Sequence, residues 1–211
     1  DSIRALVSDI SNMNAKFDNN IHLNEQLFSK IKYVHDNKDN VGLSSEDLRL
    51  LDETYNSFIR SGADLSNSDK KIYRKISERL SQLSPKYSNN VLNATNEINE
   101  YWITNTNLLS GIPKRSIEAA KLYAEEKGRP QDWCFTLDTN VGILLKSCDS
   151  QQVREDVYRK YGSKCNGGKF DNSSILKEIS KLRDQKAKLL KFDTHADYVL
   201  DRRMAKSKDI V

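Results

Sequence analysis

Apolar residues recur every three or four positions along most of this chain, which is the spacing of helices with one buried face. The clearest case runs from Phe170 to Ser207, which we predict to be two helices joined by a short turn. Asn172 is placed to cap the first helix, and Thr194 with Asp197 to cap the second. The first helix carries a stripe of Ile175, Ile179, Leu182, Lys186 and Leu189, and the second offers Ala196, Tyr198, Val199 and Met204 for packing.

The same spacing predicts helices before this stretch. The first two expected helices are Asp1–Phe17, with Ile3, Leu6, Val7, Ile10 and Met13 on one face, and Leu23–His35, with Leu27, Phe28, Ile31 and Val34 buried. The next is capped by Ser44 and Asp47 and ended by a left-handed Gly62, and it is followed by a helix from Asn67 and another from Pro85 to about Thr104. The remaining helices are Lys114–Lys127, Thr139–Ser147 and one that is capped by Ser150 and carries Val153, Val157 and Tyr161. Pro85 is expected to separate two helices because proline breaks the helical hydrogen-bond ladder.

Trp133–Leu137 is short and rich in aromatic residues, and it is the one strand candidate. With 3 prolines and 8 glycines among 211 residues, the chain has few helix breakers. We therefore predict an all-α fold, a multi-helix array with at most one short strand or hairpin near Trp133–Leu137.

The run LRDQKAKLLKF followed by THADYVLDRRMAKS resembles a segment of the thimet-oligopeptidase-like zinc metallopeptidases, peptidase family M3, whose members include bacterial peptidyl-dipeptidase (dipeptidyl carboxypeptidase) and oligopeptidase A. The resemblance extends over roughly Leu43 to Val211 through LRLLDETYNSFIRSGADLS, KKIYRKISERLSQLSPKYSNNVLNAT, WCFTLD and QQVREDVYRKY. Lys191 stands where the family pattern usually has glycine, a departure that falls at a helix end.

This resemblance implies that residues 1–211 form the helical amino-terminal lobe of a larger two-lobed enzyme built around a channel for short peptides. In such an enzyme zinc lowers the pKa of a bound water, and a glutamate takes the proton. The zinc ligands, on an H-E-x-x-H helix, would lie downstream of Val211, in a carboxy-terminal catalytic lobe that partners this one. We interpret Val211 as a truncation or a proteolytic end, and expect this part alone to be inactive.

The three histidines lie in the contexts HLNEQ, HDNKD and HADYV, so none has a second histidine one helical turn away. We therefore predict no metal ligand at His22, His35 or His195, and no catalytic or cofactor-binding residue in the chain. Asp138, Glu155 and Asp156 are acidic, but nothing in the sequence brings two of them into one pocket, so helix capping and exposed ion pairs explain them best. The aromatic side chains of Tyr101, Trp102 and Trp133 are expected to pack between helices.

The net charge of +4 arises from 34 basic and 30 acidic residues, which alternate along the helices without a basic block. Nucleic-acid binding needs a clustered basic patch, so this pattern argues against it. Cys134, Cys148 and Cys165 cannot all pair and lack C-x-x-C spacing, which favours free thiols in a reducing compartment. We predict a cytoplasmic protein, with a periplasmic or envelope-associated location as the family-based alternative, and no membrane span.

A second class of function fits the same pattern. The chain could be a stand-alone helical module that binds a partner protein through exposed apolar stripes. The two hypotheses differ in what else the protein contains, because only the peptidase requires a metal-binding catalytic lobe.

Overall fold

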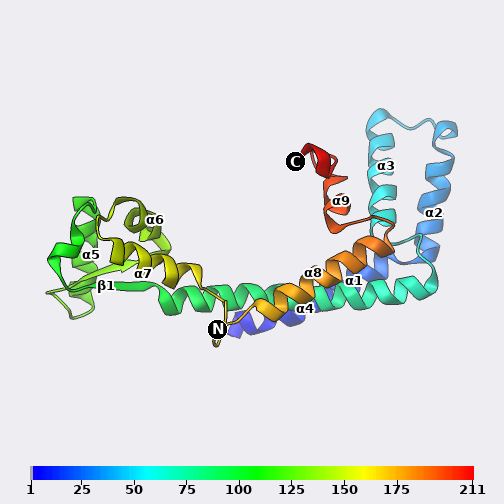
Figure 1. Cartoon of the computed structure of the whole chain (residues 1–211). Coiled ribbons are helices and arrows are strands. Elements are labelled where there is room, and N and C mark those ends of the chain that lie inside the picture. The colour runs from blue at the N-terminus through cyan, green and yellow to red at the C-terminus, as the bar shows by residue number, and fades with distance from the viewer. Residues whose placement is uncertain (1) are drawn as a thin grey trace. The chain divides into compact units, whose positions relative to one another are not determined.

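The computed structural model describes residues 2–211, with side chains from residue 6 onward (Figure 1). The predictions that concern Asp1 and the side chain of Ile3 lie outside the described residues. The chain divides into two compact units. One ends at Lys86 and resumes over Ile175–Val211, and the other is Tyr87–Ser174. Each is described by itself below.

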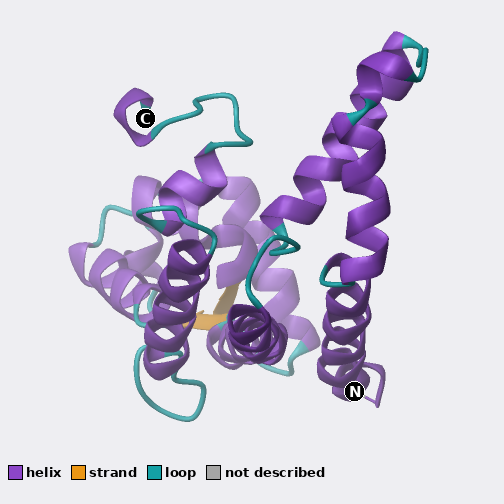
Figure 2. Cartoon of the chain, turned by 90° about the vertical axis from the view of Figure 1, so that its right-hand side faces the viewer, coloured by secondary structure: helices purple, strands orange, loops and turns teal. Residues whose placement is uncertain are grey.

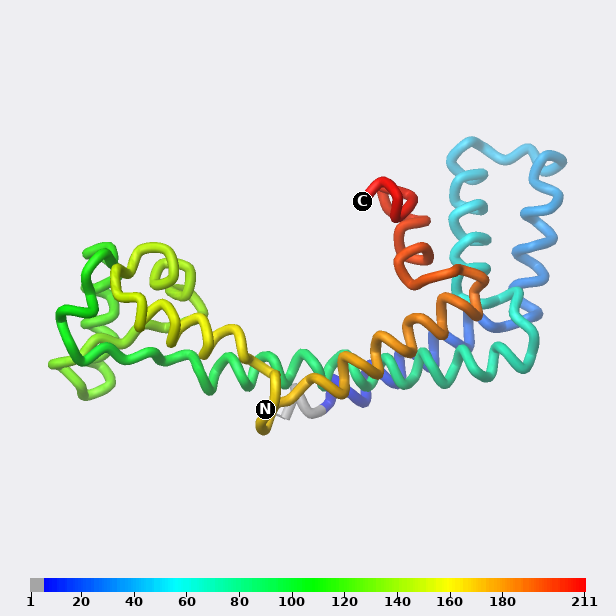
Figure 3. The backbone as a smooth tube through the Cα atoms, in the orientation of Figure 1, coloured from blue at the N-terminus to red at the C-terminus, as the bar shows by residue number. Residues whose placement is uncertain are grey.

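The first unit is built from helices. It contains α1 (Ser2–His22), α2 (Glu25–Asp36), the 3-10 turn η1 (Lys38–Asn40), α3 (Ser45–Arg60), the first part of α4 (Asn67–Ile98), most of α8 (Ser173–Leu189), α9 (His195–Leu200) and η3 (Lys208–Ile210). Figure 3 shows α2 and α3 as neighbours, joined by the loop that contains η1. The core between them includes Phe28, Phe58 and Ala63.

The second unit surrounds a small sheet. It contains the rest of α4, β1 (Glu100–Ile103), η2 (Thr106–Leu109), α5 (Lys114–Glu126), β2 (Trp133–Thr136), α6 (Leu137–Ser147) and α7 (Gln151–Gly162). Its core includes Ile103, Phe135, Leu137, Leu144, Val153 and Val157. Within the described residues β1 and β2 form the only sheet, so the predicted all-α class is confirmed (Figure 2).

The predicted caps at three helix starts are confirmed. The Ser44 hydroxyl accepts a hydrogen bond from the Asp47 amide at 3.2 Å, and the Thr194 hydroxyl does the same for the Asp197 amide at 3.2 Å. The Ser150 hydroxyl accepts from the Val153 amide at 3.4 Å. Gly62 has a φ of +87°, the left-handed conformation expected beyond the end of α3.

The prediction for the first helix was wrong in its end, because α1 continues past Phe17 to His22. Asp18, Asn19 and Asn20 are weak helix formers, but Asn19 is buried at 5% exposure and packing overrides its propensity. The prediction for α2 was wrong in its burial pattern. Phe28 is buried, whereas Leu27 and Val34 each remain 39% exposed.

Pro85 does not separate two helices, and that prediction was wrong: α4 runs without a break from Asn67 to Ile98. A proline inside a helix costs one hydrogen bond and a clash with the preceding turn. Here Leu83 before the proline and Ala94 after it are both buried, so apolar packing on each side of Pro85 holds one continuous helix.

The predicted helical end at Thr104 was also wrong, because α4 stops at Ile98 and the next residues form a strand. The strands β1 and β2 pair antiparallel, with Glu100 opposite Thr136 and Ile103 opposite Trp133. Asn99 extends this pairing: its carbonyl accepts from the Leu137 amide at 2.7 Å, and its side chain accepts from the Asp138 amide at 2.8 Å. The end of α4 thereby supplies acceptors to the start of α6.

Gly111 lies in the loop before α5, where two backbone segments come close together. It has a φ of +81°, and a Cβ at this position would overlap the carbonyl oxygen of Ser147. Nearby, the Ser110 hydroxyl donates to the Asp149 carboxylate at 2.6 Å, and the Asp149 amide donates to the Ser110 carbonyl at 2.9 Å. This approach joins the loop before α5 to the segment that follows α6.

Two side-chain predictions for the last stretch were wrong. The side-chain amide of Asn172 does not cap α8, because its oxygen accepts from Asn90 at 2.9 Å and its nitrogen donates to the Tyr87 carbonyl at 3.2 Å. The carboxylate of Asp171 instead accepts from the Ser173 amide. Met204 is fully exposed rather than packed.

The end of α8 is a helix-terminating Schellman motif with Lys191 at its left-handed position. Lys191 has a φ of +64°. The Lys191 amide donates to the Lys188 carbonyl at 3.0 Å, and the Phe192 amide donates to the Ala187 carbonyl at 3.0 Å. Lys191 is also the residue that stands where the family pattern usually has glycine.

We expect Lys191→Gly to stabilise the protein by about 0.5–1 kcal/mol, because glycine removes the steric cost of a left-handed side chain. The free energy of unfolding in urea measures this. The matched control, Lys181→Gly, replaces an exposed residue inside α8 and should destabilise by about 0.5–1 kcal/mol. Equal losses for the two variants would contradict the assignment.

Candidate functional site

Arg60, the last residue of α3, joins this helix to α9 within the first unit. Its Nη1 donates to Asp201 Oδ2 at 2.5 Å, and its Nη2 donates to the Tyr198 carbonyl at 2.6 Å. The guanidinium carbon lies 4.4 Å from the centroid of the Tyr198 ring and 5.6 Å from that of Phe192. With only 18% of the Arg60 side chain exposed, these charge-assisted and cation–π contacts form a strong link.

The turn between α8 and α9 positions Tyr198 and Asp201 next to Arg60. Lys191 is in the left-handed conformation at the end of α8, and the Thr194 cap starts α9, which contains Tyr198 and is followed directly by Asp201. The Thr194 hydroxyl also donates to Asp197 Oδ2 at 2.7 Å. This hydrogen bond, followed by Lys208, lowers the pKa of Asp197, so the cap keeps an ionised carboxylate.

A hollow of about 460 Å³ adjoins this link. It is lined by Asn56, Ile59, Arg60, Leu190, Phe192, Asp201, Arg202 and Lys206. The cationic groups in it already have partners: Arg202 pairs with Glu53, and Lys206 donates to the Asp201 carbonyl at 3.4 Å. The hollow is therefore lined by apolar side chains, one amide side chain and charged side chains that already have partners.

Lys186 is the one stripe member of α8 whose side chain is basic, and it packs against aromatic residues. Its ammonium lies 4.7 Å from the centroid of the Tyr73 ring. Burial lowers the pKa of Lys186 and raises that of Tyr73 to about 12. Burial, then the neighbouring Arg183 and Lys186, also lowers the pKa of His195, so this imidazole is neutral at pH 7.

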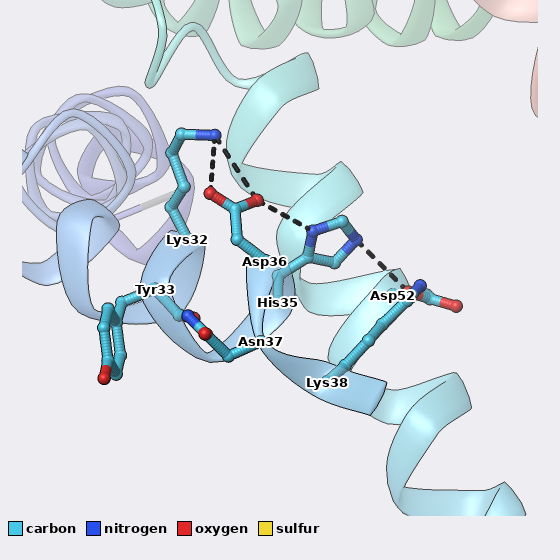
Figure 4. Close-up of polar contacts among 7 residues, drawn as sticks. All are labelled: Lys32, Tyr33, His35, Asp36, Asn37, Lys38 and Asp52. Carbon is cyan, nitrogen blue, oxygen red and sulfur yellow. Dashed lines mark hydrogen bonds and ion pairs between the residues drawn. The ribbon is translucent and has the colours of Figure 1, made fainter. Parts of the chain in front are cut away.

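The three histidines lie in separate surroundings. His22 Nδ1 lies 3.0 Å from the Asp18 carbonyl oxygen, and the His22 ring tilts against Phe58. His35 lies between Asp36 and Asp52 near the end of α2 (Figure 4). His195 stacks on Tyr198 at the start of α9. Over the residues that the structure describes, no three His, Cys, Asp or Glu side chains gather as metal ligands.

The acidic residues considered from the sequence are not brought into one pocket. Glu155 pairs with Arg159 at 2.8 Å on α7, and Asp156 accepts from the Tyr101 hydroxyl at 3.5 Å. Asp138 lies in the first turn of α6. The tryptophans lie beneath cations, with Arg129 4.2 Å from the Trp102 ring and Lys121 4.4 Å from the Trp133 ring. These contacts match the packing roles expected from the sequence.

A second hollow, of about 550 Å³, lies at the end of α7 and is lined by Tyr158, Arg159, Lys160, Gly162, Ser163 and Asn166. Its two basic side chains are engaged, because Arg159 pairs with Glu155 and Lys160 donates to the Glu100 carbonyl at 2.9 Å. It therefore presents no uncommitted charge to a ligand.

Two apolar surfaces in the first unit are exposed. On α1, five large apolar side chains are between 42% and 69% exposed: Leu6, Val7, Ile10, Met13 and Phe17. Between α2 and α3, a groove of about 390 Å³ is lined mainly by Ile31, Val34, Leu43, Leu50 and Leu51. Exposed apolar surfaces of this kind are candidate contact sites for another polypeptide. The described helices include none long and apolar enough to cross a membrane.

Comparison with known proteins gives consistent matches. Residues 144–211 match peptidase family M3. The chain is 33% identical over 189 residues to oligopeptidase A of Salmonella typhimurium, covering 87% of this chain and 28% of that protein. It is 29% identical over 210 residues to a probable cytosolic oligopeptidase A of Arabidopsis thaliana, covering 96% and 30%. It is 26% identical over 209 residues to dipeptidyl carboxypeptidase of Salmonella typhimurium, covering 98% and 31%.

These matches define the class: the chain is part of a peptidase family, and the α8–α9 segment lies inside the range that the family model matches. It belongs to peptidase family M3, as the resemblance in the sequence indicated. The chain spans 28–31% of the length of these three relatives.

Arg60 is the main feature that reasoning from the sequence missed. It stands at the head of the turn RSGADL, which carried part of the resemblance, but Asp201 lies far away in the sequence. No periodicity or spacing connects the two residues, so only the folded chain reveals the pair.

We expect Arg60→Ala to destabilise the first unit by about 1–3 kcal/mol, because it leaves Asp201 and the Tyr198 carbonyl without their donor. Urea unfolding measures the free energy, and hydrogen exchange should show loss of protection in α9. The control, Arg49→Ala, removes an exposed arginine of the same helix and should change stability by less than about 0.5 kcal/mol. Unchanged protection of α9 in Arg60→Ala would contradict the link.

The three cysteines are free, as predicted, and differ in exposure. Cys134 and Cys148 are buried, and Cys165 is partly exposed. Burial raises the pKa of the Cys134 thiol to about 11, and the Cys148 thiol donates to the Leu108 carbonyl at 3.4 Å. These two thiols are shielded from solvent, and Cys134 has little thiolate at neutral pH.

In the native protein at about pH 8, we expect Cys165 to react with a thiol-alkylating reagent at least about tenfold faster than Cys134 or Cys148. Mass spectrometry of the labelled peptides gives each rate. In urea the three rates should converge, which serves as the control. Native labelling of Cys134 at the rate of Cys165 would overturn the burial argument.

Proposed function

We propose that this chain is the amino-terminal helical part of a zinc-dependent M3 peptidase that hydrolyses short peptides. The observation that carries the proposal is the alignment itself: peptidases match 87–98% of the chain, yet the chain spans only 28–31% of them. The remainder of such a protein has room for a carboxy-terminal catalytic lobe.

The described residues do not fit a zinc site. They contain no cluster of three His, Cys, Asp or Glu side chains, and the three histidines have separate partners. The proposal therefore puts the zinc ligands and the catalytic glutamate outside this chain, and no step of hydrolysis is assigned to residues 1–211. Taken alone, these residues are expected to be inactive.

In this proposal the chain contributes shape. Its helices form one wall of a channel that admits peptides by size, and the hollow beside Arg60 supplies apolar and amide contacts of the kind an extended peptide uses. The exposed face of α1, with Ile10 and Met13 at 52% and 69% exposure, is a surface that the catalytic lobe would cover. Both partners, peptide and lobe, require contact rather than chemistry from these residues.

The proposed location is the cytoplasm. One relative is named as a probable cytosolic enzyme, and a second, from the same plant, as a chloroplast and mitochondrial enzyme. Three free cysteines suit a reducing compartment. A periplasmic or envelope-associated location is the alternative.

The test uses the protein encoded by the complete open reading frame beside residues 1–211. The longer protein should cleave short blocked peptides, lose at least about 90% of this activity in a chelator, and recover it with zinc. Residues 1–211 should show no cleavage. Product analysis also distinguishes release of carboxy-terminal dipeptides from internal cleavage, and a series of longer substrates tests the size limit.

Cleavage that resists the chelator, or its absence from the longer protein, would overturn the peptidase proposal. The second candidate would then apply, a helical module that binds a partner protein. The observation that favours it is the apolar groove between α2 and α3, in which Leu50 is 66% exposed.

A further inference from the structure

A cluster of five charged or ionisable side chains joins the end of α2 to α3, apart from the hollow beside Arg60 (Figure 4). His35 is at its centre. Its Nε2 lies 3.3 Å from Asp52 Oδ1 on α3, and its Nδ1 lies 3.6 Å from Asp36 Oδ1 on α2. Lys32 and Lys38 complete the cluster, with Lys32 Nζ 3.1 Å from Asp36 Oδ2 and Lys38 Nζ 2.7 Å from Asp52 Oδ1.

One atom of this cluster is unsatisfied. His35 Nδ1 is buried and has no hydrogen-bond partner in the described structure. A neutral imidazole carries one N–H, and Nε2, 3.3 Å from Asp52 Oδ1, is the ring nitrogen placed to donate it. The lone pair of Nδ1 then faces a carboxylate oxygen of Asp36, which is an unfavourable contact. A proton on Nδ1 turns the same contact into an attraction between opposite charges.

We propose that His35 is a proton-operated latch: its attraction to Asp52 across the two helices is strong when the imidazole is protonated and weaker when it is neutral, so that this end of the α2–α3 pair loosens. The imidazolium bridges a carboxylate on each helix, Asp36 and Asp52. Its ring also lies parallel to that of Tyr55 on α3, at 9° and 3.9 Å between centroids, where a cation gains a π contact.

The opposing groups are weaker. Lys32 and Lys38 repel the imidazolium, but their side chains are 49% and 31% exposed, so water screens both. Hydrogen bonds from Lys32 and Lys38 lower the pKa of Asp36 and of Asp52, so both carboxylates remain ionised where an imidazole titrates.

The latch lies beside the apolar groove. Val34 precedes His35 on α2, Leu51 precedes Asp52 on α3, and both apolar residues line the groove. Since the latch sets how firmly the two helices are held together, protonation of one imidazole tunes the rigidity of the groove.

Hydrogen exchange tests the latch on residues 1–211 and on the longer protein. Protection factors, which correct for the intrinsic effect of pH, should be about threefold to fivefold larger at about pH 5.5 than at about pH 8 for the amides of residues 33–40. His35→Gln should abolish this difference, and Asp52→Asn, which removes the charge opposite the imidazole on α3, should reduce it. The matched control His22→Gln should retain it.

Ring nitrogen shifts of His35 provide a second readout that does not depend on variants. Above neutral pH they should report the tautomer with its proton on Nε2 and a bare Nδ1. A proton on Nδ1 in that state would overturn the proposal, as would a pH difference in protection that survives His35→Gln. Because both readouts concern the α2–α3 pair alone, their outcome is independent of whether the protein is a peptidase.

Discussion

The first unit depends on how the guanidinium of Arg60 is satisfied. An arginine at the end of a helix normally reaches water, but this one lies against the rings of Tyr198 and Phe192, and only 18% of its side chain is exposed. A buried cation is stable only with acceptors placed around it, and the chain supplies them from α9. The reversal at Lys191, the cap at Thr194 and the position of Asp201 all serve that requirement. The segment with the strongest family resemblance is thus also the segment that Arg60 holds in place.

Much of the fold followed from local rules. Caps at Ser44, Ser150 and Thr194 and the left-handed Gly62 were predictable because each involves residues close together in the sequence. The errors share a cause. Pro85 remains inside a helix because of packing on both sides, β1 exists because β2 pairs with it, and Asn172 turns away from its helix toward Asn90. In each case a partner distant in the sequence determines the local structure, and the periodicity of apolar residues does not reveal that partner.

The site shows the same division. The resemblance identified the family correctly and directed attention to the last stretch of the chain, but it did not single out Arg60 or its partner. The environment of His35 was likewise beyond reach, since one of its two carboxylates is on another helix. The sequence also did not predict the pairing of the cationic side chains in the Arg60 hollow, because a charged residue is assigned to a solvent-exposed helix face until its partner is known. What the sequence did supply was residue spacing: its histidines lack the spacing of a zinc-binding helix, and its cysteines lack the spacing of a thiolate metal site.

Gly111 carries a consequence for how natural variation in this protein should be interpreted. The residue lies in an exposed loop, the kind of position at which sequence change is usually harmless. Its backbone angle and its approach to the Ser147 carbonyl nevertheless leave no space for any side chain. Judged by solvent exposure, a missense variant at this position would be classed as benign. Judged by backbone geometry, it would be classed as damaging, and the geometric criterion is the better guide. Tolerance to substitution here is a property of the backbone path, and surface accessibility does not report it.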